Sequence, residues 1–149
     1  MFPGARHFLN IYTDSSFFVS LYFRDAHSSA AIELAESHPR LWLTPLHIAE
    51  CFHAFAHQVF FGKIAGSVAE ELCNQLNRDR TNNLWLESPI PERAFDVSAD
   101  LARRYGPKLG IRTLDSLHVA CALELKAERF WTFDERQAKL AKAEGLKSQ

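Results

Sequence analysis

Short runs of apolar residues alternate along the chain with longer segments whose apolar residues recur at helical spacing. The short runs have the length and the bulky side chains of buried β-strands, and we expect strands there. These runs are 8–12, 41–43, 84–86 and 129–133. Short buried strands that alternate with helices indicate a parallel sheet covered on both faces. The pattern therefore predicts a three-layer α/β fold, with a short central parallel sheet of about four strands flanked by helices.

The clearest helical pattern runs from Pro45 to about Phe60. Its apolar side chains form one stripe, from which Glu50 is displaced toward the edge. Thr44 before Pro45 is a good start, because Thr caps helices and Pro suits the first helical position. Further helices are expected at 17–23, 29–37, 114–126 and 135–143.

Two other helices have boundaries that the sequence marks with capping and breaking residues. The segment from Ser67 to Glu70 matches a capping box, which predicts a helix from there to about Arg78. Another helix is expected to begin at Pro91 and to end at Gly106-Pro107. That boundary leaves residues 107–112 as a loop.

The bulk composition is that of an ordinary globular protein. A chain of 149 residues is expected to form one domain, residues 1–149, with enough core to fold without disulfides or metals. Its 47% hydrophobic and 23% charged residues exclude a disordered chain. The net charge of −1 attracts no polyanion globally, so any contact with nucleic acid must come from a local patch.

The cysteines and the hydropathy bear on the compartment. The three cysteines are far apart and form no Cys-x-x-Cys pair, which argues against a disulfide framework or a zinc ribbon and for a reducing compartment. The N-terminus lacks the apolar core of a secretory signal, and no apolar run is long enough to span a membrane. We therefore expect a cytoplasmic protein without membrane contact.

Acidic residues stand where strands end and helices begin. Asp14 and Asp134 follow the first and fourth expected strands, Glu50 lies in the second turn of its helix, and Asp115 lies in a first turn. Helix starts that follow parallel strands gather at one edge of the sheet, so these carboxylates are expected to face one crevice. Carboxylates so close repel one another unless cations neutralise them. Mg²⁺ and Mn²⁺ prefer such oxygen ligands, which favours metal-assisted hydrolysis of a phosphodiester.

Each acid also has a purely structural interpretation. Asp14, or one of the two serines after it, can cap the following helix. Asp134 with Gln137 fits a helix cap, Asp115 can stabilise a helix dipole, and Glu50 can be a solvated surface acid. These interpretations predict no convergence of the carboxylates, whereas a common site requires it.

The acid-bearing segments resemble those of PIN domains, and within that family the VapC-type ribonuclease toxins of toxin–antitoxin modules. The resemblance covers about residues 9–146 and rests on the order and spacing of several segments. These segments are Tyr12-Thr13-Asp14-Ser15-Ser16, Leu46 to Glu50, Thr113 to Ala120, and Trp131 to Gln137 with Leu140-Ala141. Two departures are a Ser at position 15 where the family commonly has Thr, and a last edge strand that is barely present.

The resemblance implies a PIN-like, Rossmann-like fold and a Mg²⁺- or Mn²⁺-dependent endoribonuclease that acts as a toxin. It implies that Ser16 and Thr132 orient the metal site by hydrogen bonds, and that the first strand lies beside the fourth. RNA as the substrate, an antitoxin partner and a homodimer also follow from the resemblance alone. The residues it makes catalytic and metal-binding are Asp14, Glu50, Asp115 and Asp134.

A run of basic residues precedes Asp115. Arg103, Arg104, Lys108 and Arg112 follow one another without an intervening acid. Arg103 and Arg104 also suit a helix C-terminus, whereas Arg112 is expected to contact a substrate phosphate. The three tryptophans sit in expected strands and are assigned to the core, while the many phenylalanines suit a core, a dimer face or an antitoxin groove.

Three other interpretations compete with this one. Glu50 with His53, and Asp115 with His118, have the Glu/Asp-x-x-His spacing of di-iron sites in helical bundles, and His57 adds a metal ligand. A haloacid-dehalogenase-like phosphatase needs a second acid two residues after Asp14, where this chain has a serine. A PIN-like module that binds RNA or protein without catalysis is the third.

Overall fold

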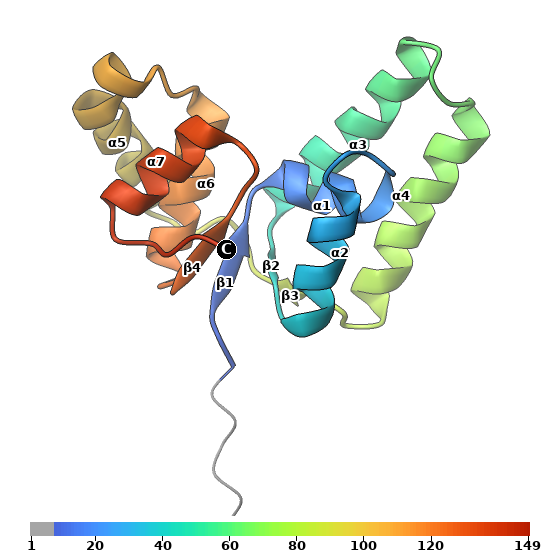
Figure 1. Ribbon diagram of the computed structural model, residues 1–149, viewed down its shortest axis with the longest axis horizontal. Coiled ribbons are helices and arrows are strands. Elements are labelled where there is room, and N and C mark those ends of the chain that lie inside the picture. The colour runs from blue at the N-terminus through green and yellow to red at the C-terminus, as the bar shows by residue number, and fades with distance from the viewer. Residues whose placement is uncertain (1–7) are drawn as a thin grey trace, which may run out of the picture.

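A small parallel sheet runs through the centre of the computed structural model, which describes residues 8–149 (Figure 1). Strand β1 (Ile11–Thr13) pairs with β4 (Arg129–Trp131), and β2 (Trp42–Leu43) pairs with β3 (Leu86–Glu87). A bridge from Ile11 to Leu41 joins the two pairs in the order β3-β2-β1-β4, and a bridge from Arg129 to Lys147 marks the edge beyond β4. The predicted parallel sheet of about four strands is confirmed, with β1 beside β4.

Helices cover the sheet as two lobes (Figure 1). One lobe consists of α1 (Ser15–Tyr22), α2 (Ser28–Ser37), α3 (Pro45–Phe60) and α4 (Gly66–Thr81). The other consists of α5 (Ala94–Leu109), α6 (Thr113–Glu124) and α7 (Glu135–Ala143). Each lobe has its own buried apolar cluster, so the architecture is the three-layer α/β arrangement predicted.

The core of the first lobe is rich in aromatic side chains. Phe17, Phe18 and Phe55 fill the first core together with Trp85 and Trp131, all of them buried. Burial of such large apolar surfaces stabilises the fold and fixes how the lobes lie on the sheet. The prediction that the tryptophans belong to the core is confirmed for these two, and Trp42 packs, partly buried, against the second core.

The start of α3 is tied to the end of β1 through His47. The backbone N–H of Thr44 donates to His47 Nδ1 at 2.9 Å, which completes a capping box at the predicted Thr44 start. The other ring nitrogen, Nε2, donates to the carbonyl of Thr13 at 2.8 Å. The ring is fully buried, and burial, together with the nearby His118, lowers its pKa well below the ordinary value. A neutral histidine therefore fixes the first turn of α3 against the residue that precedes Asp14.

The predicted boundaries of two helices are wrong. Helix α4 begins at Gly66, because Ala65 takes the extended conformation of an N-cap, and Ser67 does not cap it. Helix α5 begins at Ala94 and continues through Pro107 to Leu109. Pro107 removes one backbone hydrogen bond and crowds the carbonyl four residues earlier, but it stands only two residues before the end of the helix, where few further turns depend on it. Gly110 ends the helix, because its φ of 61° is the left-handed conformation that glycine adopts freely.

The helices and the cysteines can be compared with the expectations about membranes and disulfides. Over residues 8–149, no helix is both long and apolar enough to cross a bilayer. Cys51 and Cys121 are buried thiols and Cys73 is partly buried, and all three are free. The expectation about the N-terminal signal concerns residues 1–7, which lie outside the described residues.

Candidate active site

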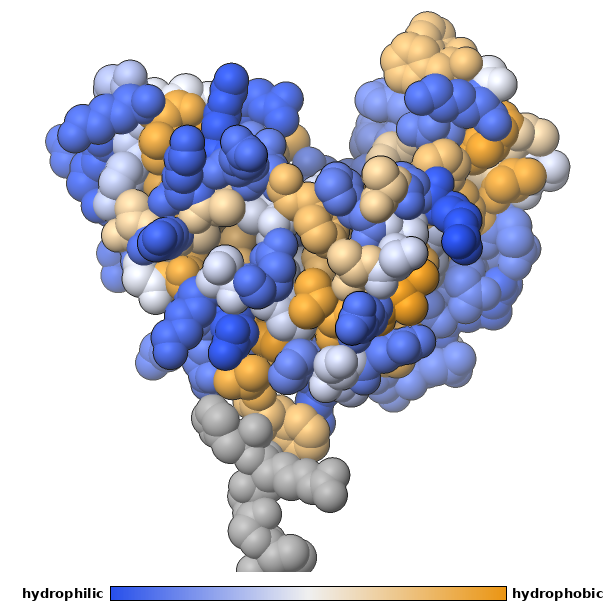
Figure 2. All heavy atoms as spheres, viewed as in Figure 1, coloured by the Kyte–Doolittle hydropathy of each residue, from blue (hydrophilic) through white to orange (hydrophobic). Residues whose placement is uncertain are grey.

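The four predicted acids lie around one pocket of about 200 Å³ at the carboxyl ends of β1 and β4. The two lobes stand apart above these strand ends and leave a notch in the molecular surface (Figure 2). A second pocket, of about 360 Å³, shares Glu50, Arg112 and Asp115 with the first and extends over Thr113 and Leu114. Residues that line the first pocket are Asp14, Ser15, Ser16, Glu50, Arg112, Asp115, His118 and Asp134.

Asp14 directly follows β1 and is both a helix cap and a buried pocket acid. Its Oδ1 accepts from the backbone N–H of Phe17 at 2.9 Å, so it caps α1. Its Oδ2 accepts from Ser16 Oγ at 2.8 Å and lies 2.7 Å from Thr132 Oγ1. Burial raises the pKa of Asp14, and these hydrogen bonds offset only part of the rise. The side chain is held rigidly, with a charge that water solvates poorly.

Glu50 reaches the pocket from the second turn of α3. Its Oε1 accepts from Ser15 Oγ at 2.8 Å and lies 2.6 Å from His118 Nε2. Partial burial tends to raise the pKa of Glu50, but the hydrogen bond from His118, and then Ser15 and Arg112, outweigh burial and lower it. Glu50 is thus held as a carboxylate at the pocket wall, and it is not a freely solvated surface acid.

The other two acids lie at the starts of α6 and α7, and both are less buried than Asp14. Asp115 lies in the first turn of α6, where its Oδ2 pairs with Arg112 Nε at 3.2 Å. Asp134 is exposed and caps α7 through a hydrogen bond of 2.8 Å from the backbone N–H of Gln137. Gln137 also donates through Nε2 to the backbone carbonyl of Asp115 at 3.2 Å, which links the starts of α6 and α7. The predicted Asp134–Gln137 cap is present, and it coexists with a place in the pocket wall.

The donor set determines which ion fits. All four acids offer hard oxygen ligands, which suit Mg²⁺ or Mn²⁺ rather than soft metals. Within the part of the chain described, no three His, Cys, Asp or Glu side chains are gathered closely enough to form a ready-made metal cage. Mg²⁺ usually keeps several waters and binds through one or two carboxylates, so a pocket walled by separate carboxylates fits a hydrated ion.

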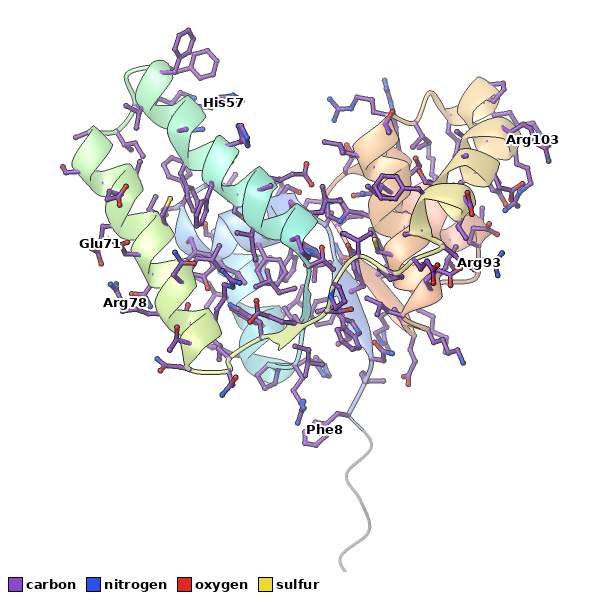
Figure 3. The ribbon with its side chains drawn as sticks, turned by 180° about the vertical axis from the view of Figure 1, so that it is seen from behind. Phe8, His57, Glu71, Arg78, Arg93 and Arg103 are labelled. Carbon is purple, nitrogen blue, oxygen red and sulfur yellow. The ribbon has the colours of Figure 1, made fainter. Side chains whose placement is uncertain are left out.

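The basic run before Asp115 divides into two groups. Arg112 lines the pocket, although its side chain is 81% exposed. Arg104 is held by Asp100 and Glu144 at 2.8 and 2.6 Å, and Arg103 lies 3.5 Å from Asp100. Arg103 projects from the outer surface of α5 (Figure 3). Arg103 and Arg104 are therefore paired with a nearby acid of their own helix, and Arg104 also with Glu144, which the fold brings to it.

The helical transition-metal interpretation is wrong, because it requires a four-helix bundle and the chain forms a parallel sheet. His53 is exposed, and His57 lies toward the far end of α3, away from the pocket (Figure 3). His118 does not join Asp115 as a ligand pair. Its ring is buried and bonds Glu50 instead.

Sequence reasoning missed two pocket contacts. Ser15 donates a hydrogen bond to Glu50, whereas the resemblance assigns the orienting role to Ser16 and Thr132 and none to Ser15. Tyr12 lies 2.8 Å from His118 Nδ1 through its hydroxyl oxygen, and nothing in the spacing of the two residues suggests this contact. The position of Ser15 at the first turn after a strand was the only available signal for its role.

The protein is a three-layer α/β protein with an acidic pocket at the carboxyl ends of its central strands, the edge at which open α/β folds place their ligand sites. The PIN domain family matches residues 11–143, so the chain is a member of the PIN domain family.

Solved structures share this fold. VapC20 of Mycobacterium tuberculosis, described as a sarcin–ricin loop cleaving toxin, has a TM-score of 0.68 at 14% identity, over 87% of this chain and 93% of that one. FitAcB from Neisseria gonorrhoeae has a TM-score of 0.63 at 15% identity, over 93% and 95%. VapBC2 from Rickettsia felis, bound to a DNA fragment from its promoter, has a TM-score of 0.62 at 15% identity, over 93% and 97%. No curated protein sequence matches this chain.

Proposed function

We propose that this protein is a metal-dependent endoribonuclease that hydrolyses phosphodiester bonds of RNA. The observation that carries the proposal is the approach of Asp14, Glu50, Asp115 and Asp134, from four separate elements, to the wall of one pocket. Independent structural roles explain each acid but give no reason for them to meet. Membership of the PIN domain family supports a nuclease as the common explanation.

The cofactor we propose is Mg²⁺ or Mn²⁺, held by these four carboxylates together with water. Such an ion lowers the pKa of a bound water and stabilises the leaving oxygen. The protein keeps Asp14 in place through Ser16 and Thr132, and keeps Glu50 in place through Ser15 and His118. Ligands that are already oriented lose less conformational freedom when they bind an ion.

For the substrate phosphate we propose Arg112. Its side chain is mostly exposed and lines both the small pocket and its wider extension. Its ion pair with Asp115 is solvent-accessible, and pairs of that kind contribute about 0–1 kcal/mol. Exchange of Asp115 for a phosphate oxygen therefore costs little, and a guanidinium can bind a phosphate with two parallel hydrogen bonds.

We further propose that the protein, acting as one domain in the cytoplasm, is the toxin of a toxin–antitoxin system, forms a homodimer and is restrained by an antitoxin. The fold shared with VapC20 and VapBC2 supports this assignment. Phe60 and Phe61 at the end of α3 are 82% and 65% exposed, and their apolar surface suits contact with a protein partner. An apolar tip at that end of the lobe is seen in Figure 2.

The proposal is tested by expressing the chain with and without the product of a neighbouring reading frame, followed by sequencing of RNA ends. The expected products carry a 5′-phosphate and a 3′-hydroxyl, and cleavage stops in EDTA. Products with a 2′,3′-cyclic phosphate that persist in EDTA would refute metal-dependent hydrolysis, because they indicate attack by the RNA 2′-hydroxyl.

A PIN module that binds RNA or protein without cleaving it is the second candidate. The observation in its favour is that Arg112 already engages Asp115 and that no cage of three ligands is preformed over residues 8–149. Purified protein that binds RNA but cleaves none at saturating Mn²⁺ would establish this alternative.

A further inference from the structure

A chain of hydrogen bonds runs from the core of the second lobe to the pocket. The hydroxyl oxygen of Tyr12 lies 2.8 Å from His118 Nδ1, and His118 Nε2 lies 2.6 Å from Glu50 Oε1. Tyr12 is fully buried and His118 is 2% exposed, whereas the Glu50 side chain is 29% exposed. The chain thus connects two core side chains to a carboxylate at the pocket wall.

The direction of each hydrogen bond follows from the chemistry of its partners. A carboxylate only accepts, so the proton between His118 and Glu50 belongs to Nε2. In the neutral ring Nδ1 is then the acceptor, and it receives the hydroxyl proton of Tyr12. Tyr12 therefore selects the tautomer of His118 that presents a donor to Glu50.

Both donors to Glu50 converge on one of its oxygens. Ser15 Oγ and His118 Nε2 each contact Oε1, and Oε2 has no hydrogen-bond partner among residues 8–149. A glutamate on a pocket wall otherwise has several rotamers available to it, and water could satisfy its charge. Two fixed donors on Oε1 hold the carboxylate in one orientation and leave Oε2 free.

We propose that His118, oriented by Tyr12, is a positioning residue that holds Glu50 for metal binding, with Oε1 anchored by the protein and Oε2 available to the ion. The inference rests on the proposed function, because it assigns Glu50 to a metal. Hydrogen-bond partners of metal ligands typically change metal affinity by about 10–100-fold when they are removed. We expect an effect in this range for His118.

Matched variants separate positioning from simple packing. His118→Gln keeps a side-chain N–H near the place of Nε2, whereas His118→Leu fills the space without a donor. Tyr12→Phe leaves the imidazole intact and removes only the hydroxyl that selects its tautomer. Mn²⁺ affinity of each full-length variant is measured by calorimetry without RNA, and ¹⁵N NMR of the imidazole in EDTA reports the tautomer. Thermal unfolding in EDTA identifies variants that fail to fold.

His118→Leu is expected to weaken Mn²⁺ binding by about tenfold or more, and His118→Gln is expected to recover most of that loss. Tyr12→Phe is expected to shift the tautomer signal and to weaken Mn²⁺ binding less than His118→Leu. Wild-type affinity in folded His118→Leu would overturn the inference, and wild-type affinity with an unshifted tautomer signal in folded Tyr12→Phe would overturn the part assigned to Tyr12. If His118→Leu fails to fold, Tyr12→Phe and His118→Gln decide the question.

The outcome also distinguishes this inference from the proposed function. A wild-type protein that binds Mn²⁺ and cleaves RNA, with His118→Leu unchanged in affinity, would overturn only the role of His118. A wild-type protein that binds Mn²⁺ without cleaving RNA, with His118→Leu weakened, would overturn the nuclease and support the positioning role. A wild-type protein that binds no Mn²⁺ would overturn both.

Discussion

Thr132 Oγ1 lies 2.7 Å from Asp14 Oδ2, although 118 positions separate the two residues in the chain. The parallel pairing of β1 with β4 sets this contact, because it aligns Thr13 with Trp131 and brings the next residue of each strand to the same edge. The Thr132 hydroxyl also accepts from the backbone N–H of Asp134 at 3.0 Å. One side chain thus joins two of the acids through the sheet.

Thr132→Val is expected to lower RNA cleavage by about 10–100-fold, because it removes a hydrogen-bond partner of a proposed metal ligand. It also leaves polar groups unpaired, and we expect the free energy of unfolding to fall by about 1–3 kcal/mol. Cleavage rates at saturating Mn²⁺ and denaturant unfolding measure the two effects. Thr132→Ser keeps the hydroxyl and is the control, and a Ser variant as inactive as the Val variant would contradict this role.

Asp115→Asn is expected to abolish cleavage while the fold survives, since Asp115 caps no helix and its ion pair with Arg112 is exposed. Asp115→Ala should behave in the same way. RNA cleavage and thermal unfolding in EDTA provide the measurements. Full activity in a folded Asp115→Asn protein would remove this acid from the site.

Asp14→Asn is expected to abolish cleavage and to leave the free energy of unfolding near or above the wild-type value in EDTA. The amide oxygen can still cap α1 through the N–H of Phe17, and loss of a poorly solvated charge offsets weaker contacts to Ser16 and Thr132. Asp14→Ala, which also loses the cap, should be less stable by about 1 kcal/mol than Asp14→Asn. Denaturant unfolding compares the two variants, and loss of folding in both would assign Asp14 a purely structural role.

Arg112→Gln is expected to raise KM for RNA severalfold and to leave the free energy of unfolding within about 0.5 kcal/mol, because the side chain is exposed. Arg103→Gln is a matched control. Arg103 is also exposed and also pairs with an aspartate three residues away, but it projects from the outer face of α5 (Figure 3). Steady-state kinetics over a range of RNA concentrations should show an effect for Arg112 alone. Equal effects of the two substitutions would indicate non-specific attraction of RNA.

His47 is expected to make the free energy of unfolding fall at acidic pH. Its pKa is lowered in the folded state, so the unfolded chain takes up a proton first as the pH falls. The stabilisation is fully present above the ordinary histidine pKa of about 6.5, and it is lost progressively as the pH falls from there toward the depressed folded value. Denaturant unfolding measured between neutral and mildly acidic pH should show that the free energy of unfolding falls more steeply with pH for wild type than for His47→Gln. Gln at this position still accepts from the N–H of Thr44 but does not titrate. Parallel curves would contradict a buried neutral His47.

The local patterns in the sequence were sufficient to predict the alternating elements, the Thr44 start of α3 and the Asp134 cap of α7. They were insufficient for α5, where Pro107 was expected to end the helix. Packing of α5 against α6 and the left-handed Gly110 determine where that helix ends. Most local preferences contribute about 1 kcal/mol or less and a proline inside a helix costs about 3 kcal/mol, and tertiary packing can exceed both.

For the site, the sequence by itself determined which acids stand next to strand ends, because that depends only on order along the chain. Their partners from distant parts of the chain were decided by the tertiary structure alone. Ser15 and His118 meet on Glu50, and Arg104 finds Glu144, only because helices from distant parts of the chain pack together. A hydrogen bond requires an approach of about 3 Å in a defined direction, and residue spacing along a chain carries no information about such distances between separate elements.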